Sequence, residues 1–436
     1  MPARARACKG ESVLEKLTGL ERRWVLYDVG NSAFVMLTST VIPIYFKNVA
    51  GAAGVSMADS TAYWSYAASL CTLIVALLGP VLGAMADARG LRKPFFVGCL
   101  LLGAGGCLLL SAPMGYLAFL GVYVLAKIGL TGSFVFYDSM LGDVTEDARM
   151  DVVSSKGYAW GYLGSCIPFT ACLLLILTAD KTGLGAAGAT AVGFWVTGLW
   201  WIAMALPLIR QYRQRHGVPR EEQLVRKSLR RIAQSLKDFR EQPHILLFLL
   251  AFFFYIDGVY TIIDLATSYG KDVGIGDTHL LLALLLTQVV AFPCSLWFAK
   301  CSKRMSTHRL IEVCIFGYIC ITLFALQLDQ AWEFWFLAVC VAVFQGAIQA
   351  LSRSYFARII PKEKASEYFG FYDIFGKGAA FTGTLLVGIS TQLSGTSKMG
   401  VALIPLLFAV GWWLLRRAVA LAQQRQAGEQ APPSQG

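Results

Sequence analysis

Long apolar runs, each bounded by a short polar segment, recur twelve times along the 436 residues of the chain. Each run is close to the roughly twenty residues that an α-helix needs to cross the hydrocarbon core of a membrane. The pattern therefore predicts an all-α polytopic membrane protein whose twelve transmembrane helices lie at residues 24–46, 62–86, 94–111, 115–141, 156–177, 191–209, 245–269, 278–299, 310–328, 332–356, 367–392 and 399–415.

Composition agrees with this pattern and argues against an ordinary soluble protein. Hydrophobic residues make up 56% of the chain and charged residues only 15%, against about 25% charged in a typical soluble domain. The formal net charge is +11, but the Lys and Arg residues are segregated by loop and form no basic patch with interleaved aromatic residues. We therefore expect no nucleic-acid partner and interpret the positive charge as a sign of membrane topology.

Lys and Arg residues collect in the N-terminal tail and in every second short loop. The intervening loops carry at most one each, namely Lys47, Lys181, Lys271 and Lys398. Because cytoplasmic loops are the ones enriched in Lys and Arg, we expect both termini in the cytoplasm and the protein in the plasma or inner membrane of a cell. The basic tail before residue 24 lacks a signal-peptide core, so we expect no cleavage; a leader cleaved near residues 50–54 is the alternative.

A basic polar segment separates the first six runs from the last six. Such a linker is typical of transporters built from two parallel six-helix repeats. Within it, apolar residues spaced along one helix face predict an amphipathic helix on the membrane surface, formed by Leu224, Leu229, Ile232 and Leu236. The expected organisation is an N-terminal tail, a first half, the linker, a second half and a C-terminal tail, at residues 1–23, 24–209, 210–243, 244–417 and 418–436.

Several charged residues lie near the middle of predicted spans: Lys127 in the fourth, Asp257 in the seventh and Lys377 in the eleventh. Charges at that depth are costly in hydrocarbon, and they usually line a polar path or pair with one another. Helical spacing places them and their polar neighbours in stripes. We expect a wet central path lined by Asp28 and Asn31 and by three stripes, which are Lys127, Thr131 and Asp138; Asp257, Tyr260, Thr261 and Asp264; and Gln345, Gln349 and Arg353.

One role for these charges is to bind substrate. A zwitterionic solute such as an amino acid needs a cation for its carboxylate and an anion for its ammonium group. Lys127 or Lys377 would supply the cation and Asp257 the anion. Alternatively, Asp257 or Asp264 carries a coupling proton, because burial raises the pKa of a carboxyl group toward physiological values.

A different role is that the charges satisfy one another. Asp373 and Lys377 have the i, i+4 spacing of an ion pair within one helix. Asp28 lies only a turn inside the first span, close in sequence to Arg22 and Arg23. The sequence leaves both readings open.

The loop between the second and third spans runs from Gly83 to Lys93 and reads Gly-Ala-Met-Ala-Asp-Ala-Arg-Gly-Leu-Arg-Lys. It resembles the loop motif that the major facilitator superfamily carries at this place. Gly83 allows a close helix approach and Gly90 a tight turn, while Asp87 can pair with an arginine or cap a neighbouring helix. We expect Gly83, Asp87, Gly90, Arg92 and Lys93 to form a charged latch that stabilises the outward-open state without touching substrate; a plain basic turn is the alternative.

A second resemblance extends from about residue 22 to residue 417. It rests on short motifs in five spans, which are Tyr27-Asp28-Val29-Gly30-Asn31-Ser32-Ala33-Phe34, Phe136-Tyr137-Asp138, Tyr255-Ile256-Asp257-Gly258-Val259, Ile348-Gln349-Ala350-Leu351-Ser352-Arg353-Ser354 and Gly376-Lys377. These motifs resemble the vacuole-effluxer branch of the same superfamily, although Val29-Gly30 stands where the family commonly has Trp-Ala. The resemblance implies the major facilitator fold and transport; the family includes fungal vacuolar exporters of neutral amino acids.

The expected function is secondary active transport of a small polar solute by alternating access, with amino-acid efflux and proton coupling as open refinements. The alternatives are a transporter of another small solute (a sugar, an organic anion or a drug) and a non-transporting receptor or scaffold. The chain has no phosphate-binding G-x-x-x-x-G-K-[ST] loop and no hydrolase-like constellation, so we expect neither an ATP-driven pump nor an enzyme. Its Cys and His residues lack metal-ligand spacing. We expect a monomer without cofactor or metal, whose partners are the lipid bilayer, the solute and, in a coupled mechanism, a proton.

Overall fold

The computed structural model describes residues 16–220, 242–272, 277–394 and 397–430, together with part of residues 227–237. Within this part of the chain, twelve helices are long and apolar enough to cross a membrane, which confirms the predicted count. The spans of the first half are α1 with α2 (Gly19–Ser39 and Val41–Ala52), α3 (Met57–Ala86), α4 (Arg92–Leu109), α5 (Tyr116–Ser139), α7 (Met150–Leu177) and α9 (Gly185–Gln211).

The second half repeats this order of six spans. They are α11 (Pro243–Asp272), α12 (Asp277–Cys301), α13 (Thr307–Ala325), α14 (Ala331–Ile359), α15 (Ala365–Ser394) and α16 (Ser397–Gln430). Short elements connect the spans, namely α6 (Leu141–Val144), α8 (Ala179–Thr182) and the 3-10 turns η1 (Asp147–Arg149) and η2 (Lys362–Lys364). Most of the predicted amphipathic helix, including Leu224, Leu229 and Leu236, lies outside the described residues.

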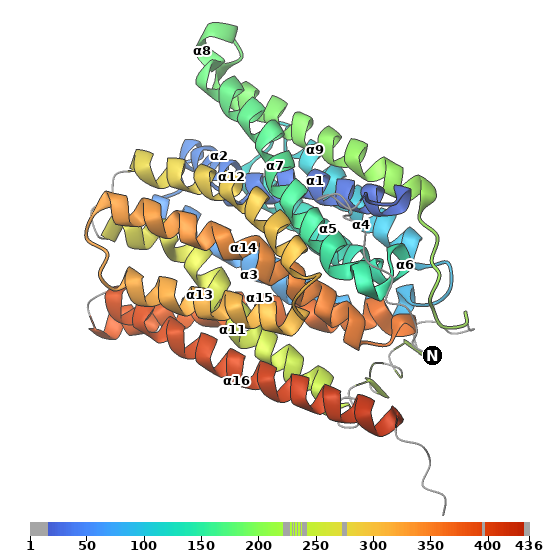
Figure 1. Cartoon of the computed structure of the whole chain (residues 1–436). Coiled ribbons are helices and arrows are strands. Elements are labelled where there is room, and N and C mark those ends of the chain that lie inside the picture. Colours follow the sequence, from blue (N-terminus) through green and yellow to red (C-terminus); the bar gives the residue numbers. More distant parts are fainter. Residues whose placement is uncertain are drawn as a thin grey trace, which may run out of the picture.

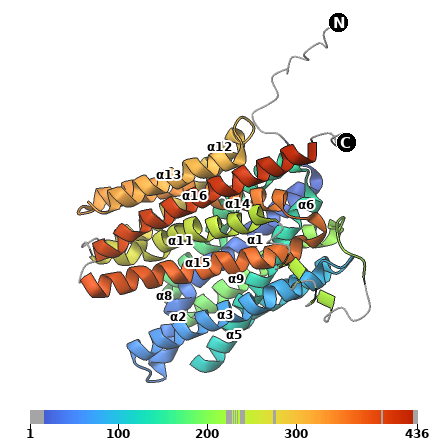
Figure 2. The ribbon, with the colours of Figure 1, turned by 90° about the horizontal axis from the view of Figure 1, so that it is seen from below.

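The helices lie side by side in one bundle, with α8 at one end and α6 at the other (Figure 1). The start of α1 and the end of α16 lie at the same end as α6 (Figure 2). We call this the linker end, because the segment that follows α9 also lies there, where Val218 pairs with Ala88. The two halves meet along two equivalent pairs of helices, α3 with α15 and α7 with α12.

The first span differs from its prediction in two ways. It begins at Gly19 because Thr18 and Glu21 cap the helix reciprocally through side chain and main chain. It is also broken at Thr40, so that α1 and α2 are separate helices rather than one helix over residues 24–46. Pro43 lies three residues after the break and lacks the N–H that a continuous helix would direct to Ser39.

The end of the chain also differs from the expected boundary. Helix α16 continues through the residues predicted as a tail, as far as Gln430. Ala418 and Val419 are buried in this extension. Buried apolar side chains of this kind stabilise a helix beyond the membrane-spanning run.

Candidate translocation site and linker-end barrier

The loop between α3 and α4 contacts the start of α15, a helix of the other half. The two carboxylate oxygens of Asp87 accept hydrogen bonds from the main-chain N–H groups of Ser366 and Glu367, each at 2.9 Å. Helix N-termini carry unsatisfied donors and a partial positive charge, so a carboxylate binds there favourably. Asp87 therefore joins the first half to the second at the linker end.

Arg92, the first residue of α4, is buried between two carboxylates. Its Nη2 lies 2.8 Å from Oδ1 of Asp87 and its Nη1 lies 2.7 Å from Oδ2 of Asp143, while its Nε donates to the Ser366 hydroxyl at 2.8 Å. Burial raises the pKa of Asp87, although Arg92 and the two α15 amides act in the opposite direction. Removing one partner of such a buried cluster would leave an uncompensated charge.

Asp143 in α6 also holds the segment that follows α9. It accepts hydrogen bonds from the Tyr212 hydroxyl at 2.5 Å and from the main-chain N–H of His216 at 3.0 Å. Gln214 of the same segment accepts from the main-chain N–H of Gly90 at 2.9 Å. The chain leaving the first half is therefore packed against the loop that contacts α15.

The glycines of this loop motif serve different purposes. Gly90 has a φ of +82°, in the left-handed region that favours glycine. A Cβ at Gly83 would overlap the carbonyl oxygen of Ser366 and come within 3.0 Å of the Cα of Glu367, so α3 and α15 pack without a side chain between them. Lys93 is half-buried and forms no ion pair within the part of the chain that the structure describes.

Arg353 of α14 extends from the second half into a polar cluster of the first. Its Nη1 lies 3.0 Å from Oδ1 of Asp138 on α5, and its Nη2 lies 3.3 Å from Oδ2 of Asp28 on α1. The interpretation that Asp28 pairs with Arg22 or Arg23 is wrong. Five and six residues of helix turn those arginines away from the face on which Asp28 is buried.

Aromatic rings and a hydroxyl complete the surroundings of Arg353. Its guanidinium carbon lies 4.6 Å from the ring centre of Trp24 and 4.5 Å from that of Tyr158, both within the range of a cation–π contact. Its Nε donates to the Ser154 hydroxyl at 2.9 Å. Arg353 is only 2% exposed and is enclosed by helices α1, α5 and α7.

A third cluster forms around Asp151 in the first turn of α7. Its Oδ1 lies 2.7 Å from Nη2 of Arg358 and accepts from the Ser354 hydroxyl at 2.5 Å, both on α14. Its Oδ2 accepts from the hydroxyl of Thr307, the first residue of α13, at 2.6 Å. We use the name linker-end barrier for these three inter-half clusters, centred on Asp87, Arg353 and Asp151.

The charges predicted near mid-span fall into two groups. Asp373 and Lys377 form the ion pair that their spacing predicts, with Nζ 2.5 Å from Oδ2. Lys127 on α5 lies 3.4 Å from the Thr38 hydroxyl of α1. Lys127 and Lys377 both act electrostatically on Cys71 of α3, so the two lysines face one region between α3, α5 and α15.

Asp257 lies apart from these lysines, between α11 and α15. It is fully buried, and a Cβ at Gly383 of α15 would overlap its carboxyl group. The Thr261 hydroxyl lies 3.4 Å from its Oδ1, whereas its Oδ2 has no hydrogen-bond partner among the described residues. The side chain of Asp264, predicted on the same stripe, is outside the described part.

The predicted polar residues of α1 and α14 also separate. Asn31 lies with its Nδ2 3.5 Å from Oδ1 of Asp28, at the edge of the Arg353 cluster. Gln349 is 3.5 Å from the Tyr162 hydroxyl of α7. Gln345, one turn before Gln349 in α14, lines a cavity inside the second half. The stripe from Gln345 to Arg353 therefore runs from that cavity to the linker-end barrier.

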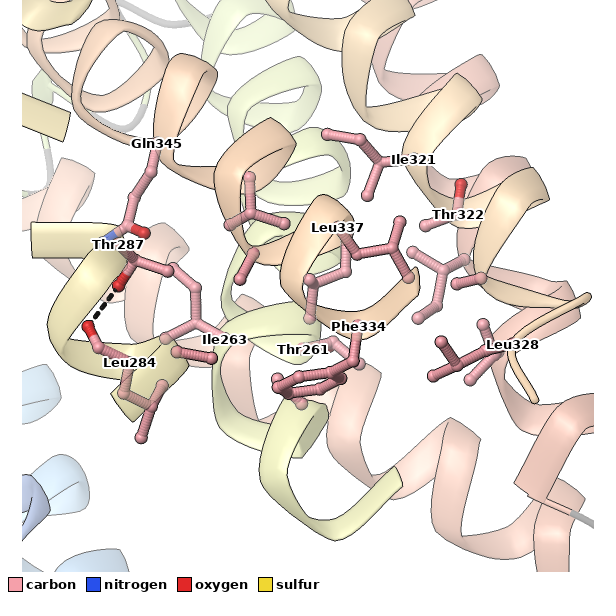
Figure 3. Close-up of a pocket in the computed structure, with 18 of the residues that line it drawn as sticks. Thr261, Ile263, Leu284, Thr287, Ile321, Thr322, Leu328, Phe334, Leu337 and Gln345 are labelled. Atoms are coloured by element: carbon pink, nitrogen blue, oxygen red, sulfur yellow. Dashed lines mark hydrogen bonds between the residues drawn. The ribbon is translucent and has the colours of Figure 1, made fainter. Parts of the chain in front are cut away.

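This cavity has a volume of about 130 Å³ and is enclosed by α11, α12, α13, α14 and α16. Its wall is mainly aliphatic, and Figure 3 shows Phe334, Leu337 and Ile263 facing it. Gln345 and the hydroxyl of Thr261, one helical turn after Asp257, are among its few polar groups. An engineered apolar cavity of roughly 150 Å³ binds benzene, so this one can hold a ring-sized or branched aliphatic group.

Sequence reasoning missed the Asp151 cluster and the aromatic partners of Arg353. The predicted fifth span begins at residue 156, which leaves Asp151 in the preceding loop, whereas α7 begins at Met150. A usable signal was present: Asp151 is followed by the small residues Ser154, Ser155 and Gly157 at helical spacing, a pattern that permits close contact between helices.

Comparison with known proteins gives a consistent family. A family model described as "Vacuole effluxer Atg22 like" matches residues 21–148 and 142–429. The MFS-type transporter YxiO of Bacillus subtilis (strain 168) is 41% identical over 404 residues, which cover 92% of this chain and 94% of that protein. Autophagy-related protein 22 of Coccidioides immitis (strain RS) is 23% identical over 434 residues, covering 80% and 71% of the two chains.

Solved transporter structures, among them the major facilitator superfamily transporter FucP, share the fold. FucP in its outward conformation matches with a TM-score of 0.68 and 14% identity, over 92% of this chain and 97% of that one. A bacterial homologue of the iron transporter ferroportin, in its outward-facing state, matches with a TM-score of 0.68 and 11% identity, over 92% and 98%. At these identities the likeness extends to the fold alone.

Proposed function

Because the chain belongs to the Atg22-like vacuole effluxer family and is a secondary transporter of the major facilitator kind, we propose that it moves a small polar solute by alternating access of its two halves. The observation that carries this proposal is the position of Arg353, a residue of the second half held by Asp28 and Asp138 of the first. Opening the linker end requires α14 to withdraw this side chain from α1 and α5. The ion pairs of Arg353 therefore belong to the state that is closed at the linker end.

The loop between α3 and α4 acts as a latch in this mechanism. Asp87 and Arg92 hold the start of α15, and Gly83 allows the backbones to meet. These contacts must break when the halves separate at the linker end. With both termini in the cytoplasm, as the Lys and Arg distribution favours, the latch stabilises the state that is closed to the cytoplasm and open outward.

The substrate we propose carries a carboxylate and a compact apolar group, as a neutral amino acid does. Lys127 of α5, which faces the same region as the Asp373–Lys377 pair, would attract the carboxylate. The apolar cavity beside Thr261 suits an aliphatic or aromatic side chain. Asp257 would receive the ammonium group through Oδ2, which has no hydrogen-bond partner among the described residues; this requires that the rocking of the two halves brings Asp257 of α11 toward Lys127 of α5.

An organic anion without an ammonium group is the second candidate substrate. It is favoured by the two cations, Lys127 and Lys377, that face the same region beside Cys71. Such a substrate would not need Asp257. Replacing Asp257 by Asn therefore separates the two candidates: uptake of an amino acid falls, whereas uptake of a simple organic anion is retained.

Flux measurements in proteoliposomes test the function directly. Labelled amino acids, sugars and organic anions are assayed with and without a proton gradient. We expect saturable flux of a carboxylate-bearing solute that falls at least tenfold in Lys127→Gln. Folded protein that carries no solute of the three classes would contradict the transport proposal and favour a receptor or scaffold, while sugar flux that is insensitive to Lys127→Gln would contradict the proposed substrate.

A further inference from the structure

The cluster around Arg353 contains more acidic than basic groups. Asp28 and Asp138 share the single guanidinium of Arg353, one oxygen each. The nearest further acid, Asp373, is neutralised by Lys377. With every group in its ordinary ionised form, the cluster would carry one uncompensated negative charge away from bulk water.

Such a charge is costly in a protein interior. Two carboxylates that face one another across a single cation disfavour simultaneous ionisation, and a buried charge needs a partner of opposite sign. Arg353 cannot supply a second positive charge, and Trp24 and Tyr158 cover the faces of its guanidinium. The arrangement is therefore complete only when a further cation binds to one of the two carboxylates.

Arg353 is the one cation of the described residues that acts strongly on Asp138. The charges that act most strongly on Asp138 are those of Arg353, Asp28 and Asp373. The other titratable groups that face the cluster are phenols, whose ordinary pKa is about 10: Tyr137 of α5, Tyr158 and Tyr162 of α7, Tyr260 of α11 and Tyr372 of α15. Lys156 of α7, which is also buried, is not among the groups that dominate at Asp138.

Building on the transport function above, we propose that Asp28 and Asp138 form the site at which this transporter binds its coupling proton, with Arg353 as the positioning residue. Asp138 is the point of entry, because 16% of its side chain is accessible against 8% for Asp28. The proton bonds to Oδ2 of Asp138, since Oδ1 receives the Arg353 hydrogen bond. Nothing else is formed or broken in this step, and the proton leaves again by the reverse reaction.

Protonation at this site changes the linker-end barrier. The closed barrier buries the cluster, so binding of the proton to Asp138 removes the surplus charge there and favours the closed state, while Asp28 still neutralises Arg353. Loss of the proton leaves two carboxylates on one guanidinium and favours separation of α14 from α5, which exposes the cluster to water. Solute flux and proton movement become coupled through the same side chain that connects the two halves.

Infrared difference spectroscopy of the reconstituted full chain tests this site without any substrate. Above about pH 5 exposed carboxyl groups stay ionised, so a neutral-carboxyl C=O band that appears on acidification within the range from pH 8 to pH 5 reports a buried acid. We expect a band from the Asp28–Asp138 cluster in the wild type, shifted in D₂O; absorbance from other buried acids, Asp257 among them, is separated from it by the variants below. A wild-type spectrum without this band overturns the proposal, whatever the variants do.

Isosteric variants assign the band. Asp138→Asn and Asp28→Asn should each remove it, because one carboxylate paired with Arg353 leaves no surplus charge. Asp257→Asn, at a buried acid outside the cluster, should leave it unchanged. Absorbance that neither cluster variant reduces, or that only Asp257→Asn reduces, overturns the assignment. Asp138→Glu, which keeps the carboxyl group, should restore a band at a shifted frequency and serves if the Asn variant fails to fold.

Failure of the proton site can be told apart from failure of the transport proposal. If the panel of solutes shows no flux but the band is present and assigned to Asp28 and Asp138, the proton site stands and the transport proposal fails. If solute flux is found but does not respond to a proton gradient, and no band is seen, transport stands and the proton site fails.

Discussion

The carboxylate of Asp151 on α7 and the guanidinium of Arg358 near the end of α14 lie 2.7 Å apart and join the two halves of the transporter. This contact is the counterpart of the one between Asp87 and the start of α15, with one difference. At Asp87 the acid lies in an inter-helix loop and binds main-chain amides. At Asp151 the acid lies in a helix and binds side chains. The loop between α12 and α13, at the equivalent place in the second half, therefore needs no copy of the Gly83–Lys93 motif.

Replacing Asp151 by Asn should weaken the linker-end barrier. The variant loses a charge-assisted contact to Arg358 and keeps its size, and hydrogen bonds to charged groups contribute about 1.5–3 kcal/mol. Thermal unfolding of the purified protein should occur at a lower temperature than in wild type. The matched control is Asp329→Asn, which removes an exposed pair with Lys398 at the opposite end of the bundle; exposed pairs contribute about 1 kcal/mol or less. Equal unfolding temperatures in both variants would argue against a structural role for Asp151.

A methyl group at position 83 should separate α3 from α15. In Gly83→Ala the new Cβ overlaps the main chain of Ser366, and overpacking of this kind costs about 1–3 kcal/mol. We expect a lower unfolding temperature together with slower solute flux, because the latch no longer closes fully. Gly98→Ala on α4 is the control: nothing lies within 4 Å of a Cβ there, and the change favours the helix by up to about 1 kcal/mol. A Gly83→Ala protein as stable and active as Gly98→Ala would contradict the close approach.

The cavity of the second half should determine which solutes are carried. Ala338 lines it and is 9% exposed, so Ala338→Phe fills space that a ligand group would occupy. Filling a cavity leaves stability unchanged or raises it, but uptake of solutes with large apolar groups should fall at least tenfold relative to glycine-sized ones. Val410→Phe, on an exposed position of α16, should alter neither quantity. Unchanged selectivity in Ala338→Phe would exclude the cavity from the substrate site.

The sequence predicts the twelve spans and the two-half fold well, because burial in lipid imposes long apolar runs. It also predicts the Asp373–Lys377 pair, since both residues lie on one helix at i, i+4. The break at Thr40 was missed because α1 and α2 form one uninterrupted apolar run. Hydropathy does not distinguish a broken helix from a continuous one.

Contacts between the halves were harder to foresee. Helical spacing places Asp138 and Arg353 on inward faces of their helices, but in two separate polar stripes of a wet path. Their meeting depends on how α14 crosses α5 and on which end of the bundle is closed, and helical spacing within one segment contains neither. The same limitation led to the wrong partner for Asp28, since nearness in sequence pointed to Arg22 and Arg23.

Transport in this mechanism requires the linker end to open, and a reversible cross-link across that end is the sharpest test of this requirement. Lys362 of the second half lies 2.6 Å from Asp147 of the first, on the exposed side of the barrier. In a cysteine-free background, Asp147→Cys and Lys362→Cys are joined by a short, reducible thiol cross-linker. We expect efficient cross-linking, loss of solute flux in the cross-linked protein and recovery after reduction, with each single-cysteine variant unaffected. Flux at the wild-type rate in fully cross-linked protein, or failure of the two thiols to cross-link, would contradict it.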